Sequence, residues 1–182
     1  MTFESGYTTW PFPMVASHGP WSLTPWDVAV SDSDPVSASW EVGNTAVYMP
    51  VKIPVVCILK RVWWANGATV SGGATVEAGI YSDSGYAPGT KVVSGSATQG
   101  TASQVQFVDV TDVTLPPGLY WLALMMSSTT NTTGMRISGS VVSDGARRFQ
   151  QASANPLPST ATPVQSSNQF YWAYGFSTTT IT

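Results

Sequence analysis

Short apolar and β-branched runs recur from Ala46 onward, each bounded by glycine, proline, asparagine, aspartate or serine. Runs of this length with period-two alternation are typical of β-strands. Their spacing, mostly about ten residues, favours an antiparallel sandwich or barrel. The sequence therefore predicts an all-β domain of about eight strands, with a turn of helix only at residues 145–152. The expected strands are residues 46–53, 55–64, 74–82, 91–94, 104–110, 119–126, 134–142 and 168–176.

Alternation within these runs indicates which side chains face the core. Val76, Ala78 and Ile80 share one face of their strand, so we expect Glu77, on the opposite face, to be exposed. Residues 119–126 are apolar on both faces. That strand is therefore expected either in the centre of a sandwich or beneath a cover that lies outside it.

Adjacent aromatics provide a second signal. Trp63 and Trp64 lie on one expected strand, so their side chains point to opposite faces. One of them can enter the core, while the other needs a partner elsewhere. Exposed tryptophan and tyrosine side chains stack on sugar rings or fill protein interfaces. We therefore take Trp63, Trp64 and Tyr86 as candidate glycan or interface aromatics, with burial in the core as the alternative.

Turn residues mark the connections between strands. Asn66-Gly67 suits a tight hairpin, because both residues accept positive φ. Asp109 and Asp112 are expected to flank a strand end, where aspartate commonly forms turns. The doublet Arg147-Arg148 is expected in a solvated loop. Residues 152–167, rich in proline, serine, threonine and alanine, are expected to form a long surface loop.

The first 45 residues differ from the rest, because prolines and tryptophans are interleaved there. Proline removes a backbone donor and fixes φ, so this stretch is expected to be extended or turning chain. An arm so aromatic must pack on its own domain, on a sister subunit or on another protein. The sequence thus predicts an extended arm at residues 1–45 and a β-sandwich domain at residues 46–182. The candidate partner-binding residues of the arm are Trp10, Trp21, Trp26 and Trp40.

The amino-acid composition excludes several classes of protein. Charged residues make up 9% of the 182 residues, and the chain has 1 Cys, 1 His and a net charge of −3. So few Cys and His exclude a disulfide framework and a structural zinc site. An acidic balance without a basic run argues against binding to duplex nucleic acid. With no secretory signal and no membrane-spanning stretch in the sequence, we expect a soluble protein made in a cytoplasm. Cys57 is expected to be a small buried apolar residue.

Residues suited to catalysis are sparse. His18 is the only histidine, and its place in the proline-rich arm favours a solvated or capping role over a Ser-His-Asp triad. The sequence contains no nucleophile elbow, P-loop or dinucleotide-binding glycine motif. Asp27, Asp32 and Asp34 are oxygen ligands of the kind calcium prefers, but an Asx turn before Pro35 is favoured. We therefore predict a non-enzymatic protein without cofactor or metal.

Several segments follow one another along residues 45–126. They are AVYMPVKIP at 46–54, RVWWANG at 61–67, EAGIYSDSG at 77–85 with PGT at 88–90, and PPGLYWLA at 116–123. In this order they resemble small jelly-roll virion proteins of tailed bacteriophages. The resemblance implies a jelly-roll-like antiparallel β-sandwich and a virion structural role, often in a trimer. It implies no catalytic residues.

Two functions remain open within that resemblance. In the first, the chain is a capsid-surface decoration protein that docks through its arm on major capsid or other virion subunits and self-associates. In the second, it is a tail- or fibre-associated module whose exposed aromatics and residues 127–133 contact host-surface glycans. The aromatic arm favours the first function, with the virion as the location and a trimer as the oligomer. This first function predicts that deletion of residues 1–40 leaves a folded β domain that is no longer incorporated into the virion.

Overall fold

A computed structural model describes residues 22–23, 36–53, 55–130, 132–138, 148–166 and 170–178. Within these ranges the chain forms thirteen strands and no helix, so the prediction of an all-β protein is confirmed. The strands are β1 (Ser22–Leu23), β2 (Val36–Ser39), β3 (Thr45–Ile53), β4 (Cys57–Ala65), β5 (Thr75–Asp83), β6 (Pro88–Thr98), β7 (Val105–Leu115), β8 (Gly118–Met126), β9 (Thr133–Ser138), β10 (Phe149–Gln151), β11 (Val164–Gln165), β12 (Phe170–Trp172) and β13 (Tyr174–Ser177).

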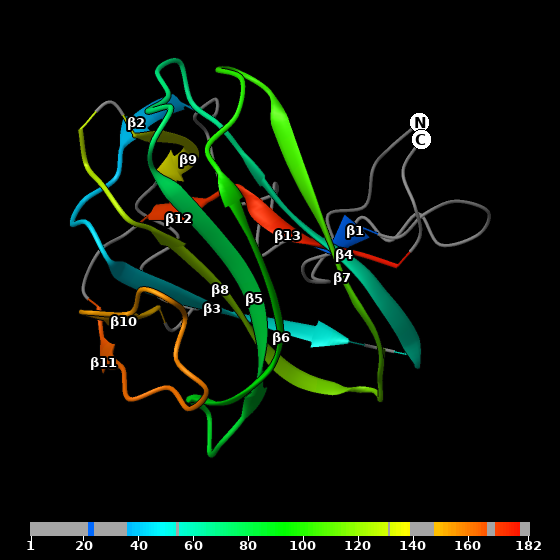
Figure 1. Cartoon of the computed structure of the whole chain (residues 1–182). Helices are drawn as coiled ribbons and strands as arrows, with labels where there is room; N and C mark the ends of the chain where they lie inside the picture. The colour runs from blue at the N-terminus through cyan, green and yellow to red at the C-terminus, as the bar shows by residue number, and fades with distance from the viewer. Residues whose placement is uncertain are drawn as a thin grey trace, which may run out of the picture.

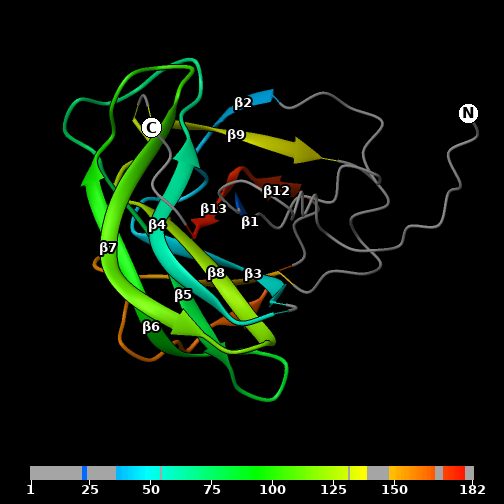
Figure 2. The same ribbon diagram turned by 90° about the vertical axis from the view of Figure 1, so that its right-hand side faces the viewer.

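The strands form two facing sheets and a small third one (Figures 1 and 2). One sheet has the order β1-β13-β4-β7, the second β11-β10-β3-β8-β5-β6, and the third β12-β9-β2. All strand pairs are antiparallel. The predicted antiparallel sandwich is therefore confirmed. Among the described residues there is no helix long and apolar enough to span a membrane.

The six longest strands follow a jelly-roll pattern. β3 pairs with β8, β4 with β7, and β5 with β6, so the three pairs are nested in sequence. Successive pairs alternate between the two sheets, because β4 and β7 lie in one sheet while the other four strands lie in the other. A long antiparallel ribbon rolled into a two-layer sandwich gives this arrangement, as in jelly rolls.

Two hydrophobic clusters lie on the two faces of β8. The larger fills the space between the sheets and contains Val76, Ala78 and Ile80, as the alternation predicts. The smaller lies on the outer side and contains Tyr48, Tyr81 and Trp121. β8 is thus both central in its sheet and covered from outside.

The outer cluster is covered by residues 152–163, which we call the strap (orange in Figure 1). The strap is mostly irregular, as expected, but residues 164–165 of the predicted loop form strand β11. The strap is also hydrogen-bonded to the edge strand β6. The Lys91 amide donates to the Ser159 carbonyl at 2.8 Å, and the Ala161 amide donates to the Gly89 carbonyl at 2.8 Å. Leu157 inserts its side chain into the outer cluster. A segment without regular structure therefore replaces a third layer of the sandwich.

The β-sandwich domain begins earlier than predicted. β2, at Val36–Ser39, pairs with β9, and Trp40 is only 2% exposed. The Trp40 ring lies 4.7 Å from the Trp172 ring, centroid to centroid, inside the main core. Residues 36–45, assigned to the arm from their composition, therefore belong to the domain. Deletion of residues 1–40 would cut into its core.

Two local predictions are wrong. Residues 149–151 form strand β10 rather than part of a helical turn. Asn66-Gly67 does not close a hairpin, because β4 and β5 lie in different sheets. Instead the Gly67 amide donates to the Thr133 carbonyl at 2.9 Å, and Asn66 forms a bridge with Gly134. The two residues begin a crossover that is held on β9.

Candidate functional site

Large exposed hydrophobic side chains concentrate beside one pair of strands. Ile58 on β4 and Val105 and Phe107 on β7 are 46%, 49% and 39% exposed, and Val55 and Val56 lead into β4. We call the outward side of these two strands the β4–β7 face. These residues form two groups on the face, one at the start of β4 and one at the start of β7, and exposed apolar groups of this kind mark interaction sites more often than single exposed residues do.

The register of β4 with β7 explains how this face is built. Trp63 lies opposite Phe107, and Ile58 lies opposite Thr114. The inward side chains of the same strands, among them Leu59, Val62 and Trp64, are buried in the core. Alternation over residues 62–65, with Val62 and Trp64 buried, therefore leaves Trp63 facing outward.

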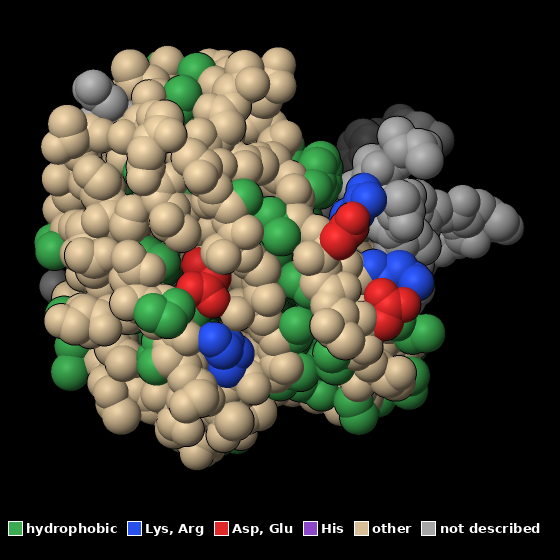
Figure 3. Space-filling view, in the orientation of Figure 1, with side chains coloured by type: hydrophobic (Ala, Val, Ile, Leu, Met, Phe, Trp, Pro, Cys, Tyr) green, Lys and Arg blue, Asp and Glu red, His purple; other side chains and the backbone are tan. Residues whose placement is uncertain are grey.

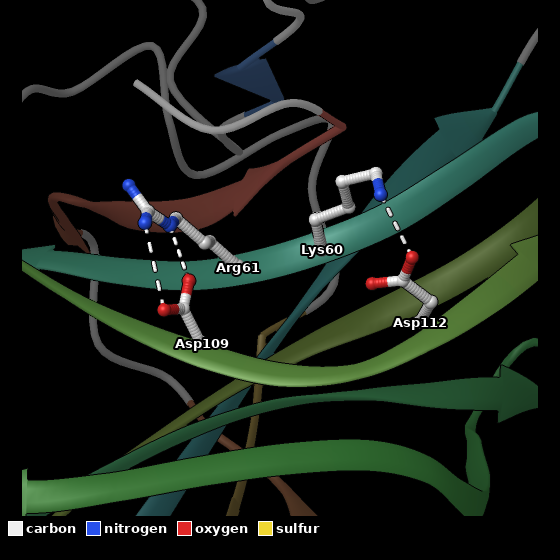
Figure 4. A network of polar contacts seen from close by, with 4 residues as sticks. All are labelled: Lys60, Arg61, Asp109 and Asp112. Carbon is white, nitrogen blue, oxygen red and sulfur yellow. Dashed lines mark hydrogen bonds and ion pairs between the residues drawn. The ribbon is translucent and has the colours of Figure 1, made fainter. Parts of the chain in front are cut away.

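Two ion pairs cross the face between the strands (Figure 4). Lys60 Nζ lies 2.7 Å from Asp112 Oδ2, and Arg61 Nε contacts Asp109 Oδ1. A register shift between Leu59 and Arg61 lets the adjacent Lys60 and Arg61 both reach the acidic side chains of β7. Both cations thus come from β4 and both carboxylates from β7.

These pairs correct the expectation that Asp109 and Asp112 flank a strand end, because both lie within β7. The side chains of Asp109 and Asp112 are 74% and 58% exposed, whereas those of Arg61 and Lys60 are 18% and 38% exposed. Ion pairs whose carboxylate faces solvent in this way contribute about 0–1 kcal/mol to stability. They therefore matter chiefly for the charge pattern of the face. Figure 3 shows two such pairs flanked by hydrophobic side chains where Figure 1 draws β4 and β7.

The N-terminal segment joins this same sheet. Ser22 and Leu23 form β1, which pairs with Ser177 and Phe176 of β13. β13 in turn pairs with β4, so the arm attaches two strands away from the β4–β7 face. The remaining predicted arm residues Trp10, Trp21 and Trp26 lie outside the described residues.

Three predicted aromatics have clear positions. Trp40 and Trp64 are 2% and 0% exposed, so as core residues they are not available to a partner or a glycan, which corrects their prediction as binding residues. Trp63 is half-buried on the outward side of β4. Of these three tryptophans, only Trp63 remains a candidate for binding at the surface.

Tyr86 is 67% exposed at the turn between β5 and β6. Gly85 and Tyr86 both have φ of 65°. The Asp83 carboxylate fixes the base of this turn, because it accepts the Tyr86 amide at 3.2 Å and Trp121 Nε1 at 2.8 Å. A bulky residue in the left-handed region is unusual, and such residues cluster at functional sites. Tyr86 thus presents an aromatic ring on a rigid turn, away from the β4–β7 face.

Glu77 is buried, contrary to expectation, since it is only 6% exposed. Its carboxylate accepts Ser94 Oγ at 2.7 Å and the Leu157 amide at 2.8 Å, and Lys91 Nζ lies 3.7 Å away. Every visible partner of this carboxylate belongs to β6 or the strap. We therefore assign Glu77 to the attachment of the strap.

Other titratable groups also have structural surroundings. Burial raises the pKa of Tyr48 to about 12 and raises the pKa of Tyr81 further. Cys57 is a buried free cysteine in the main core, as predicted, and burial raises the pKa of its thiol. Within the described ranges, no three His, Cys, Asp or Glu side chains gather to hold a metal ion. The residues His18, Asp27, Asp32 and Asp34 lie outside these ranges.

Two further predictions are corrected. Arg148 is 2% exposed and pairs with Glu41 at 3.1 Å, so it is not a solvated loop residue. In the loop at residues 127–133, Thr132 and Thr133 are buried, which removes them as glycan contacts. Both corrections arise because side chains distant in sequence close over these positions.

The exposed apolar residues of the β4–β7 face were not predicted as site residues. Alternation separates Val105, Phe107 and Asp109 from their neighbours, but it does not tell which set faces the core. The outward side could have been identified from charge, because the acidic residues of 105–115 and the basic doublet Lys60-Arg61 favour the solvent-facing side of their strands. No protein-family model matches this chain, and comparison with curated proteins finds no match.

Proposed function

We propose that the chain is a non-enzymatic virion structural protein of a tailed bacteriophage, a decoration protein of the capsid surface. Its support is the resemblance of residues 45–126 together with the jelly-roll-like sandwich. The observation that carries the proposal is the exposed β4–β7 face in the sheet to which the N-terminal arm is joined. The face has apolar side chains at both ends and ion pairs between them, and protein interfaces combine apolar and polar contacts of these kinds.

In this role, the arm docks on major capsid subunits or other virion proteins, and the β4–β7 face serves contacts between copies. Trp10, Trp21 and Trp26 are the docking residues, since buried tryptophan dominates many interfaces. Repeated burial of apolar area at symmetric sites then stabilises the shell. The location is the virion, and the resemblance favours a homotrimer.

Binding to capsids that lack this chain tests the proposal. We expect saturable cosedimentation of the purified full-length protein with such capsids. The triple variant W10A/W21A/W26A should bind about tenfold or more weakly, because interface tryptophans carry much of the affinity. The Y86A variant serves as the matched control and should bind like the wild type. Absence of saturable binding by the wild-type protein would refute the decoration role.

A second function is favoured by Tyr86. A rigidly held, exposed tyrosine can stack on a sugar ring, as a tail- or fibre-associated glycan-binding module requires. In that case the protein binds intact host cells, soluble surface polysaccharide competes, and Y86A abolishes binding. The W10A/W21A/W26A variant would then bind cells normally. The same two variants therefore separate the two functions.

A further inference from the structure

We propose that the β4–β7 face is self-complementary and pairs with the same face of a second copy across a two-fold axis. The axis runs parallel to the two strands, in the plane of the interface and midway between β4 and β7. The inference deepens the self-association in the proposed function and rests on it, but it replaces the trimer that the resemblance favours with a two-fold contact between two copies. It names the surface, the partner and the symmetry of that contact.

The charge pattern carries the inference. Lys60 and Arg61 form a basic row on β4, and Asp109 and Asp112 form an acidic row on β7 (Figure 4). Rotation by 180° about the proposed axis lays β4 of each copy over β7 of the other. Each basic row then lies over the partner's acidic row. Each ion pair of one copy thereby meets the equivalent pair of the other copy, so two cations and two carboxylates share one network at each level of the strands. Opposed surfaces of complementary charge fix the register of an interface.

The register within one copy makes the rows coincide in height. Arg61 and Asp109 are direct cross-strand neighbours, so a rotation about an axis along the strands keeps them at one level. The other two-fold axis in the plane of the face runs across the strands and lays β4 over β4. That arrangement opposes cation to cation, and juxtaposed like charges are costly in an interface. Charge therefore selects one of the two arrangements.

The apolar part of the face fits the same symmetry. Trp63 lies opposite Phe107 within one copy, so the rotation brings Trp63 over the partner's Phe107 and the converse. Aromatic pairs contribute about 0.5–1.5 kcal/mol beyond their buried area. Ile58, which is 46% exposed, lies on the other side of the ion pairs along β4. The rotation places it over Thr114 of β7 in the second copy. Apolar contacts thus lie on both sides of a charged centre, as a closed two-fold interface allows.

Charge reversal on purified protein tests the pairing. The K60E/R61E variant makes the whole face acidic, and the D109K/D112K variant makes it basic. By analytical ultracentrifugation we expect the wild type to be a dimer, each variant alone to be a monomer, and an equimolar mixture to form a heterodimer. The K52E variant is the control, because Lys52 is exposed on the other sheet, and it should dimerise like the wild type.

Circular dichroism and thermal melting verify that each variant folds. The F107S variant changes no charge and should raise the dimer dissociation constant about tenfold or more, which is the effect of removing an interface aromatic. A wild type that stays monomeric up to about 100 µM, a weak-affinity limit, would overturn the pairing. A trimeric wild type, or a mixture that fails to associate, would also overturn it. Capsid binding is measured in a separate experiment. A wild type that dimerises but does not bind capsids would refute the decoration role and leave the pairing of the two faces intact.

Discussion

Gly67 is held where no larger residue fits. A Cβ atom at this position would lie 2.3 Å from Thr133 Oγ1 and 2.4 Å from Ser37 Oγ. Those two hydroxyls also bind the following residues, since Ser37 Oγ accepts the Ala68 amide and Thr133 Oγ1 accepts the Thr69 amide. The first residues of the crossover between the sheets are thus packed directly on β2 and β9.

We therefore expect G67A to reduce the free energy of unfolding by about 1–3 kcal/mol, which is typical of overpacking. Gly72 is the matched control, because a Cβ there has no atom within 4 Å. The G72A variant should unfold like the wild type within about 0.5 kcal/mol, as surface changes usually do. Urea denaturation measures both, and equal stabilities of the two variants would contradict the packing described here.

Buried tyrosines predict sensitivity to alkali. Burial raises the pKa of Tyr48 from 10.0 to about 12, so the folded protein keeps a proton that the unfolded chain loses. Stability is then fully present below pH 10 and falls by up to about 1.4 kcal/mol per pH unit between these two values. The Y48F variant should show a shallower loss when unfolding is measured from pH 9 to 12. An unchanged slope in Y48F would contradict this origin.

The strap is the element whose position depends most on polar contacts. Lys91 Nζ donates to the Leu157 carbonyl at 2.6 Å, and the Tyr81 hydroxyl donates to the Pro158 carbonyl at 2.6 Å. The Glu77 carboxylate accepts the Leu157 amide beneath them. A buried carboxylate is tolerated only where cations and donors surround it.

Removal of the cation should therefore release the strap. We expect K91M to reduce the free energy of unfolding by about 3 kcal/mol, because it leaves the Glu77 carboxylate buried beside no ammonium group. Hydrogen exchange of the Ala161 amide, which is bonded to Gly89, should accelerate. The K60M variant breaks an exposed pair and should cost less than about 1 kcal/mol. If K91M and K60M had the same effect, the strap would not depend on this charge.

The sequence predicts strands better than it predicts their surroundings. Alternation places Val76 and Ile80 in the core, because period-two burial is a local property of one strand. It places Glu77 wrongly, because the cover over that face comes from the strap, far along the chain. Asn66-Gly67 has hairpin chemistry, but the nested pairing sends the next strand to the other sheet. Long-range pairing of this kind is not encoded in any short window.

The candidate site is predictable only in part for the same reason. The adjacency of Trp63 and Trp64 correctly implies one core and one outward side chain, but only the tertiary structure tells which is which. Trp40 has the proline-rich neighbourhood of an arm, and burial against Trp172 overrides that composition. The acidic row of β7 is visible in the sequence, but its alignment with Lys60 and Arg61 follows from strand register.

For the molecule as a whole, the boundary between arm and domain is testable by truncation. Deletion of residues 1–21 spares every described strand, so we expect a thermal midpoint close to that of the full chain. Deletion of residues 1–40 also removes β2 and Trp40, and loss of a buried tryptophan alone costs about 3–5 kcal/mol. Differential scanning calorimetry compares the two. Equal midpoints would contradict the boundary at Val36.

The most direct test of the central claim, that this chain is a capsid decoration protein, is a cryo-electron microscopy reconstruction of particles assembled with it. The account predicts a two-layer β-sandwich at symmetric positions on the outer shell, with the N-terminal segment against the capsid. The β4–β7 faces of neighbouring copies should meet about local two-fold axes. A bare shell, or density for this chain only at the tail, would contradict the account.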